Sequence, residues 1–312
     1  MPRISHPLDG VLLFDKPIES SSNTALQKVR RLFQAEKAGH TGTLDPLATG
    51  LLPICFGEAT KFSAALLNAH KTYRALLRLG QTTSTGDAEG EIIAEFPVRI
   101  GLAEVDAVLA KFRGEIQQIP PMHSAIKHQG KPLYEYIRQG KTIQREPRSV
   151  VIYELLLNHL GDHEMDITVR CSKGTYVRTL AEDIGAALGC GAHLIGLRRT
   201  AVAHFALAQG FDFQRLEAMS TAERLACLLP MESLLPDMPK LYLTGAQVKR
   251  LAQGQKLGLD TTLLDGNVSL HGPSGFIGVG VLQGTCLIPD RMLSSVAKQA
   301  AQADMTENFG VE

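Results

Sequence analysis

Long hydrophobic runs are missing from this sequence. No apolar stretch approaches the roughly 20 residues that a membrane-spanning helix needs, and residues 1–10 lack the basic and apolar regions of a secretory signal. We therefore expect a cytoplasmic protein with no membrane partner. With 44% hydrophobic residues in a chain of 312, the composition is that of a folded protein with room for one large domain and a small one.

Clustered cysteines and the common phosphate and metal motifs are also missing. The five cysteines lie far apart without a CxxC pair, so neither a disulfide framework nor a zinc knuckle is expected. The sequence contains no GxxxxGK[ST] loop, no GxGxxG and no HExxH. The spacing of Cys190 and His193 alone is weak support for zinc. We expect neither a metal nor a cofactor.

Net charge is the third quantity that is lacking. A formal charge of zero argues against nucleic-acid binding by bulk electrostatics, because phosphate contacts need Lys and Arg. Locally, however, residues 16–78 contain nine Lys or Arg against four acids, and residues 122–148 contain six against two. Acids gather between residues 87 and 115. Either basic segment alone is typical of solvated charge, but together they favour a molecule with one basic side.

Hydrophobic periodicity predicts a mixture of strands and helices over the first 230 residues. Strands are predicted at residues 10–14, 71–79, 150–157, 165–171 and 194–205. Helices are predicted to begin within residues 20–23, to span residues 102–112, and to follow Gly174. Residues 39–53, with three glycines and two prolines, are predicted to form a structured loop, and residues 122–148 a long insertion.

The composition changes after three closely spaced prolines, Pro230, Pro236 and Pro239, which suggest a domain boundary. Beyond them, short strands are predicted at residues 240–243, 268–271, 276–282 and 285–288, with a helix near residues 244–252. This pattern indicates a small β-rich module. A polar tail follows from about residue 298.

Asp45 is the lone carboxylate of the segment GHTGTLDPLATGLLP at residues 39–53. One interpretation is structural, because Asp followed by Pro is a favourable start for a helix that would begin at Pro46. The other is functional, because the same segment contributes the polar residues His40, Thr41 and Thr43 beside glycines that allow a ligand to approach the backbone. These residues alone leave both interpretations open.

The segment that contains Asp45 resembles the signature of the TruB family of pseudouridine synthases. Other segments agree with that family in order, so the resemblance covers most of residues 10–205 and is far more specific than one short motif. They are GVLLFDKP at 10–17, KTYRALLRLG at 71–80, TSTGDAEG at 83–90, PPMHSAIKHQGKPLYEYIRQG at 120–140 and KGTYVRTLAEDIG at 173–185.

The resemblance implies an α+β fold, with a mixed, largely antiparallel sheet, flanking helices and a small β-rich C-terminal domain of the PUA-like type. It implies a catalytic domain at residues 1–230 with an RNA-clamping insertion at about 120–148, a PUA-like domain at 240–300 and a polar tail at 301–312. The C-terminal domain either binds RNA or only stabilises the catalytic domain. Its six basic residues against eight acids after Pro230 do not favour RNA binding.

The family's catalytic aspartate falls on Asp45, its active-site tyrosine on Tyr73, and the arginine that pairs with the aspartate on Arg178. A guanidinium beside a carboxylate favours its charged form and fixes its direction. A tyrosine offers an apolar face to the uracil ring and a hydroxyl that can relay a proton.

The resemblance also implies residues that contact the substrate or its RNA. His40 matches the histidine that fills the space left by the extruded nucleotide. Lys16 matches a lysine that supports the site, although a charge on a surface turn is the alternative. The remaining expected contacts are Gly42, Thr43, Leu197, Lys127 and Lys131.

The implied activity is conversion of the uridine at position 55 in the T-loop of tRNA to pseudouridine. The glycosidic C–N bond is cut and the base is rejoined through carbon after it has been flipped out of the RNA. Attack of Asp45 at C1′, addition at C6 and elimination all remain open, with action at the sugar favoured. The insertion favours stand-alone action without a guide RNA. A monomer is the default expectation.

Three rival functions differ from this one in the residues that they require. An RNA-binding protein that had kept only the fold would not need Asp45, Tyr73 and Arg178 intact. The guide-dependent branch of the family lacks an insertion that resembles residues 120–148. A glycosidase normally needs two acids at a set separation, and the sequence suggests no second acid near Asp45.

Overall fold

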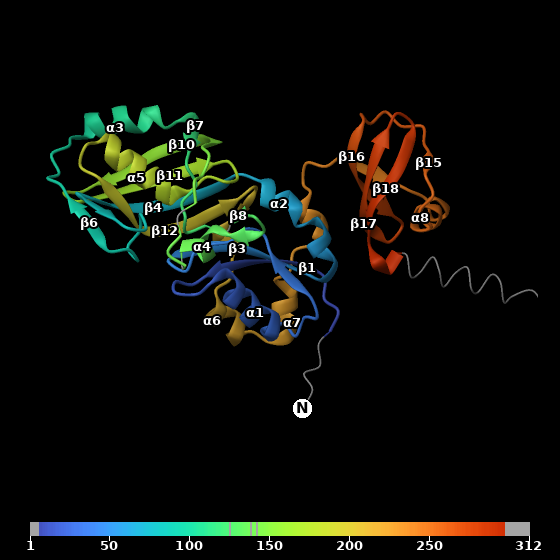
Figure 1. Cartoon of the computed structure of the whole chain (residues 1–312). Coiled ribbons are helices and arrows are strands. Elements are labelled where there is room, and N and C mark those ends of the chain that lie inside the picture. The colour runs from blue at the N-terminus through green and yellow to red at the C-terminus, as the bar shows by residue number, and fades with distance from the viewer. Residues whose placement is uncertain (1–5, 125, 138, 142, 297–312) are drawn as a thin grey trace, which may run out of the picture.

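The structure is a computed structural model that describes residues 6–124, 126–137, 139–141 and 143–296. Two bodies can be distinguished, a large one of mixed sheet and helices and a small one made mostly of strands (Figure 1). The predicted α+β fold with a β-rich C-terminal part is confirmed. No helix in the described ranges combines the length and the apolar character that crossing a membrane requires.

The large body is built on one sheet whose strands run in the order β1-β3-β12-β4-β11-β10-β7, with β2 added beside β3 and β13 beside β12. All of these neighbours are antiparallel except β3 and β12, which are parallel. The expected mixed, largely antiparallel sheet is therefore present. The strands are β1 (Gly10–Lys16), β2 (Ala38–His40), β3 (Ala48–Phe56), β4 (Lys71–Leu79), β7 (Gly114–Gln118), β10 (Arg148–Leu160), β11 (Glu164–Cys171), β12 (Ala192–Val202) and β13 (Phe205–Ala206).

Helices cover the two halves of this sheet. In α5 (Val177–Ala187), the predicted apolar stripe is buried and shares a core with α3 (Leu102–Lys111) and strands β4, β11 and β10. At the other end, α1 (Ser22–Leu32) and α6 (Phe213–Ala218) pack on β1 and β3. The burial of these stripes supplies most of the stability of such short helices. Apart from the helix of the insertion, the remaining helical elements described in this body are α2 (Ala64–Asn68), α7 (Thr221–Ala226), η1 (Gly57–Phe62), η2 (Leu207–Gln209) and η3 (Met231–Leu234).

The prediction of a loop throughout residues 39–53 was wrong. Strand β2 runs to His40 and β3 begins at Ala48, so only the segment between them is irregular. Nearly every residue of β3 is buried, and a strand buried on both faces reads as an apolar run without alternation. The proposed helix at Pro46 is also absent, because the Ala48 amide bonds the Asp45 carbonyl at 3.0 Å in a turn that leads into β3.

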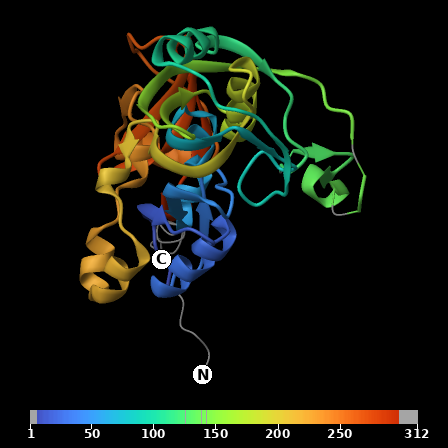
Figure 2. The same ribbon diagram turned by 90° about the vertical axis from the view of Figure 1, so that its left-hand side faces the viewer.

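The long insertion stands away from the rest of the large body, as Figure 2 shows for the green segment that contains α4. It contains β8 (Lys127–His128), β9 (Lys131–Pro132) and α4 (Leu133–Ile137). Another short hairpin, formed by β5 (Gln81–Thr83) and β6 (Ile92–Glu95), follows β4 directly in the sequence. Elements this short leave no clear period in the sequence, which is why none was predicted within the insertion.

The small body is a five-stranded sheet in the order β14-β16-β17-β18-β15. Its elements are β14 (Lys240–Tyr242), α8 (Gly245–Ala252), β15 (Leu257–Gly258), β16 (Gly266–Gly272), β17 (Gly275–Gln283) and β18 (Cys286–Met292). The strands predicted in this region and its helix are confirmed. The predicted polar tail at 301–312 lies outside the described residues.

The two bodies meet at η1. The Lys61 ammonium donates to the Met292 carbonyl at 2.9 Å, and the Ser294 amide donates to the Glu58 carboxylate at 2.6 Å. The rings of Phe62 and Phe276 also meet edge to face at 5.2 Å. Besides these contacts, the two bodies share one apolar core, which contains buried residues from the strands of both.

Candidate active site

The loop between β2 and β3 carries Asp45 and is held from three directions. The Ser22 hydroxyl, at the start of α1, accepts from the Leu44 amide at 2.8 Å and donates to the Leu44 carbonyl at 2.9 Å. The Lys16 ammonium reaches the Pro46 carbonyl at 3.4 Å. Arg199, from β12, donates to carbonyls on the other side of the loop. The backbone on both sides of Asp45 is therefore fixed.

Lys16 is completely buried, so its interpretation as a charge on a surface turn was wrong. Its ammonium donates to the Ser20 carbonyl at 2.6 Å and the Pro17 carbonyl at 2.8 Å, besides that of Pro46. Burial lowers the pKa of Lys16 to about 8, against the attraction of Asp45. The side chain supports the turn under the loop and does not line the cavity described below.

Asp45 and Arg178 form an ion pair, with 2.5 Å between the guanidinium and carboxylate atoms. The two partners differ in exposure, because the Asp45 side chain is 54% exposed and that of Arg178 only 8%. Arg178 lies in the first turn of α5, where the helix holds it against the core. The acid is thus presented to solvent by a cation that is itself buried.

A second carboxylate shares Arg178, contrary to the expectation that no other acid lies near Asp45. Asp87 binds the other guanidinium nitrogen at 3.1 Å and is only 6% exposed. It also accepts from the Thr85 hydroxyl at 2.5 Å and the Glu89 amide at 3.1 Å. Asp87 is therefore the buried anchor of Arg178, and Asp45 is the carboxylate with exposed oxygen atoms.

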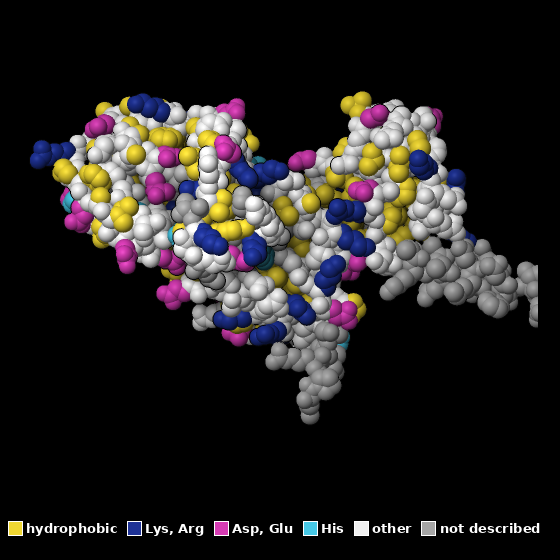
Figure 3. Space-filling model, viewed as in Figure 1, with side chains coloured by type: hydrophobic (Ala, Val, Ile, Leu, Met, Phe, Trp, Pro, Cys, Tyr) yellow, Lys and Arg dark blue, Asp and Glu magenta, His cyan; other side chains and the backbone are white. Residues whose placement is uncertain are grey.

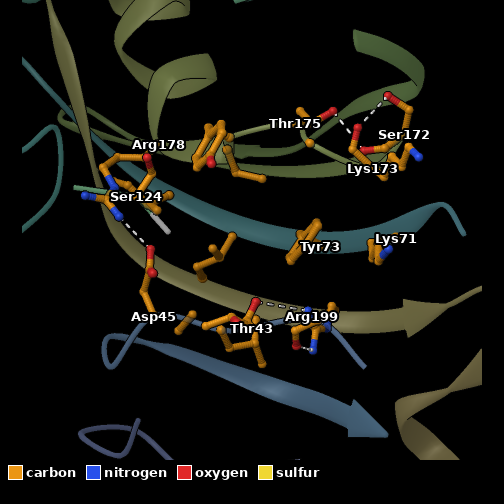
Figure 4. Close-up of a pocket in the computed structure, with 18 of the residues that line it drawn as sticks. Thr43, Asp45, Lys71, Tyr73, Ser124, Ser172, Lys173, Thr175, Arg178 and Arg199 are labelled. Atoms are coloured by element: carbon orange, nitrogen blue, oxygen red, sulfur yellow. Dashed lines mark hydrogen bonds and ion pairs between the residues drawn. The ribbon is translucent and has the colours of Figure 1, made fainter. Parts of the chain in front are cut away.

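A cavity of about 280 Å³ opens beside Asp45. Figure 4 shows Asp45 and Arg178 at one end, Lys71 and Lys173 at the other, and Tyr73 between them. Its described lining is Gly42, Thr43, Leu44, Asp45, Ala48, Leu67, Lys71, Tyr73, His123, Ser124, Ser172, Lys173, Gly174, Thr175, Tyr176, Val177, Arg178, Leu194, Leu197 and Arg199. A cavity with apolar walls and a few charged groups is typical of a site that binds a small molecule or part of a larger ligand.

Tyr73 comes from β4 and is partly buried at the centre of this cavity. Burial raises the pKa of its hydroxyl, and the positive charge of the Arg199 guanidinium opposes the rise. Tyr73 is therefore a neutral phenol at physiological pH. It can offer a ring face and a proton to a ligand.

His40 lines a neighbouring cavity of about 420 Å³ rather than that of Tyr73. Both cavities are bounded by Thr43, Asp45 and Arg178, so the ion pair stands between them. The Nδ1 atom of His40 is buried and has no hydrogen-bond partner among the described residues. Burial, with a contribution from Arg199, lowers the pKa of His40, so its ring is neutral at physiological pH.

Comparison with known proteins gives consistent matches over nearly the whole chain. Residues 30–177 match the description "TruB family pseudouridylate synthase (N terminal domain)", residues 178–236 match "tRNA pseudouridylate synthase B C-terminal domain", and residues 239–293 match "Pseudouridine synthase II TruB, C-terminal". The chain belongs to the TruB family of pseudouridine synthases. The resemblance stated from the sequence is therefore confirmed.

Individual relatives of this TruB family member agree. A tRNA pseudouridine synthase B of Methylobacillus flagellatus is 52% identical over 279 residues, which cover 89% of this chain and 92% of that protein. One of Chromohalobacter salexigens is 49% identical over 299 residues, covering 95% and 97%. Among solved structures, a chain in a Cbf5-Nop10-Gar1 complex aligns with a TM-score of 0.70 at 24% identity, covering 92% of this chain and 85% of that one. This last likeness shows the fold alone.

The other residues predicted for the site fall into two groups. Gly42, Thr43 and Leu197 line the cavity of Tyr73. Lys131 is exposed on β9 and lines neither that cavity nor the one beside His40, and the side chain of Lys127 lies outside the described part of the chain. The described insertion reaches the two cavities through His123 and Ser124 at its base.

Several residues of the site were not singled out from the sequence. Asp87, Lys71 and Lys173 lie in segments that carry the family resemblance, which is the signal that could have found them. Arg199 lies outside those segments. Its role depends on contacts with residues about 150 positions earlier in the chain, which no local pattern reveals. Within the described ranges, no group of three or more His, Cys, Asp or Glu is arranged to hold a metal ion.

Proposed function

We propose that the protein converts the uridine at position 55 in the T-loop of tRNA to pseudouridine, with Asp45 as the catalytic carboxylate. The observation that carries this proposal is an exposed carboxylate, paired with a buried arginine, at the wall of a cavity that also contains a tyrosine. The relatives named tRNA pseudouridine synthase B, at about half identity over nine tenths of the chain, support the choice of tRNA as the substrate.

The reaction breaks the bond between uracil N1 and ribose C1′, turns the base and joins C5 to C1′. C5 loses its proton and N1 gains one, so the product is an isomer of the substrate. Asp45 is proposed to act at the sugar, where negative charge stabilises the positive character that develops as the glycosidic bond breaks. Arg178 keeps the carboxylate in one orientation because Asp87 fixes the guanidinium from its far side. Tyr73 is proposed to support the ring with its face and to relay a proton through its hydroxyl.

A uridine stacked in a folded T-loop must leave its stack before it can enter such a cavity, and this extrusion has to be offset by new contacts. We propose that His40 occupies the vacated space, since it lies across the Asp45–Arg178 pair from Tyr73. Gly42, Thr43 and Leu197 are proposed to contact the flipped nucleotide. Lys127 and Lys131 are proposed to contact phosphates from the insertion.

The basic side expected from the sequence offers a path for the rest of the RNA. In Figure 3, Lys and Arg gather over the middle of the molecule, from β8 and α1 to the side of the small body, while Asp and Glu are frequent toward the end that carries β6. Phosphate contacts along such a face would position the tRNA without reading its sequence.

We also propose a division of the chain into domains. Residues 1–230 form the catalytic domain with the RNA-clamping insertion at about 120–148, and residues 240–300 form a PUA-like domain. The protein is proposed to act as a cytoplasmic monomer without a guide RNA. A binding protein without catalysis is the rival, and the presence of Asp45, Tyr73 and Arg178 around one cavity disfavours it.

The test is to incubate the purified protein with an unmodified T-arm stem-loop and to map pseudouridine nucleotide by nucleotide. We expect a product at position 55 and at no other uridine. A matched stem-loop with cytidine at that position should bind without yielding product. Binding of the uridine stem-loop with no pseudouridine formed would support the rival function and overturn this one.

A further inference from the structure

Helix α2 borders the Tyr73 cavity, and two successive leucines on it have different surroundings. Leu66 is 1% exposed and belongs to the apolar core that the two bodies share. Leu67 is 45% exposed and lines the cavity. A leucine that stays exposed contributes much less to the stability of the fold than a buried one, so its apolar surface is available to a ligand in the cavity.

This helix is too short to be stable by itself. It has five residues, and no side chain caps its first turn. Isolated helices shorter than about 12 residues are marginal in water. The position of Leu67 must therefore be fixed by contacts with the rest of the protein. One of these is the burial of Leu66, and others lie at the C-terminal end of the helix.

The Lys71 ammonium holds that C-terminal end. It donates to the carbonyls of Leu66 at 3.1 Å, Leu67 at 2.9 Å and Ala69 at 2.7 Å. Positive charge is also favourable at this end of a helix. An ammonium group has three hydrogen-bond donors, so none remains for a ligand although Lys71 lines the cavity.

Lys71 is a costly residue to bury for stability alone. Its exposure is 8%, and none of the ion pairs among the described residues includes it. It precedes Tyr73 by two residues on β4, so both side chains lie on one face of the sheet. Figure 4 shows Lys71 and Lys173 at the end of the cavity away from Asp45. Lys173 provides a second attachment of α2, because it donates to the Asn68 side chain at 2.8 Å.

We infer that α2 forms a substrate-binding wall at the end of the cavity away from Asp45, where Leu67 contacts the flipped base and Lys71 is the positioning residue that holds Leu67 in place. The base is detached from the sugar while it turns. An apolar wall at this end limits its movement and keeps its C5 atom within reach of C1′. The inference rests on the proposed function, because it assigns roles within that reaction.

Replacing Leu67 tests the wall. Single-turnover pseudouridine formation and affinity for the T-arm stem-loop are measured for the wild type, Leu67→Ala and Leu67→Met. Loss of the exposed part of a leucine side chain should slow the reaction about five- to tenfold. Methionine is apolar and of similar volume, so it should keep the rate within about twofold. Affinity should be unchanged in both variants, because phosphate contacts dominate it.

The matched control is Leu156→Ala. Leu156 is also 45% exposed, but it lies on β10 and lines neither the cavity of Tyr73 nor that of His40. This variant should react as fast as the wild type. If Leu67→Ala did so too, the wall would be refuted.

A double-mutant cycle tests whether Lys71 acts through Leu67. Lys71→Met removes three hydrogen bonds from the end of α2 and should slow the wild-type background about tenfold. In the Leu67→Ala background, the same substitution should slow the reaction by no more than about twofold, because the side chain that Lys71 positions is already gone. A loss that came only from a weakened fold would be equal in both backgrounds.

Thermal unfolding is measured for every variant. If Lys71→Met does not fold, the cycle is run with Asn68→Ala, which removes only the exposed hydrogen bond to Lys173 and should slow the reaction about threefold while Leu67 is present. Equal losses in both backgrounds would overturn the role of Lys71 while the wild type remains active. An inactive wild type would instead overturn the proposed function.

Discussion

Replacing Asp87 with asparagine should slow pseudouridine formation by about 30-fold without weakening tRNA binding. Asp87 and Arg178 are 3.1 Å apart and both nearly inaccessible to solvent, so their contact is stronger than a surface ion pair. Losing one partner of a buried pair destabilises by about 3–5 kcal/mol. Asparagine keeps an oxygen acceptor and Arg178 keeps Asp45, so we take about 2 kcal/mol as the loss of positioning, which corresponds to roughly 30-fold in rate.

The assay is tritium release from tRNA labelled at uracil C5, followed under single-turnover conditions. Asp166→Asn is the matched control, because Asp166 also pairs with an arginine, Arg74, but lines no part of the Tyr73 cavity. It should react at the wild-type rate. A wild-type rate for Asp87→Asn would refute the argument that this buried acid orients Arg178 and, through it, Asp45.

Three further predictions concern stability and RNA binding. Gly50→Ala should destabilise the fold by about 2 kcal/mol or more in urea unfolding, since φ is +100° and the added Cβ would meet the Arg199 backbone; an unchanged midpoint would contradict this packing. Deleting residues 126–137 and closing the gap with glycines should weaken tRNA binding and flatten its salt dependence, whereas identical affinities across a salt series would exclude an RNA clamp. Burial lowers the pKa of Lys16 from 10.5 to about 8, so the unfolded chain binds more protons between those values and stability should rise with pH there relative to Lys16→Met. Urea unfolding of the two proteins at pH 8 and pH 10 checks the sign, and a constant difference would contradict it.

The strands and helices that could be predicted are those that bury only one face, because their apolar residues then recur with the period of a strand or a helix. Strand β4 alternates between core and solvent, and α5 has a continuous apolar stripe, so both were found from the sequence. Strand β3 was not, because burial on both faces removes the alternation and its glycine and proline suggest a loop. Gly50 is required by its approach to Arg199, and that contact exists only after the sheet has formed.

The site residues that could be predicted from the sequence are those that the family resemblance names. Asp45, Tyr73 and Arg178 were singled out, and the structure places all three around one cavity. The buried polar contacts could not be predicted from the sequence. Lys16 lies in a segment whose sequence is typical of a surface turn, and Asp87 lies among several exposed acids. The burial of these two residues could therefore not be predicted from the sequence. Such contacts depend on partners brought together by the sheet.

The most direct measurement is nucleotide-resolved mapping of pseudouridine in a T-arm stem-loop treated with Asp45→Asn, beside the wild type. Asparagine is nearly the same size and keeps an oxygen for Arg178, so the substitution removes the negative charge with little change of shape. We expect wild-type affinity for the stem-loop and no detectable product at position 55. Appreciable conversion by Asp45→Asn would show that the chemistry does not depend on this carboxylate.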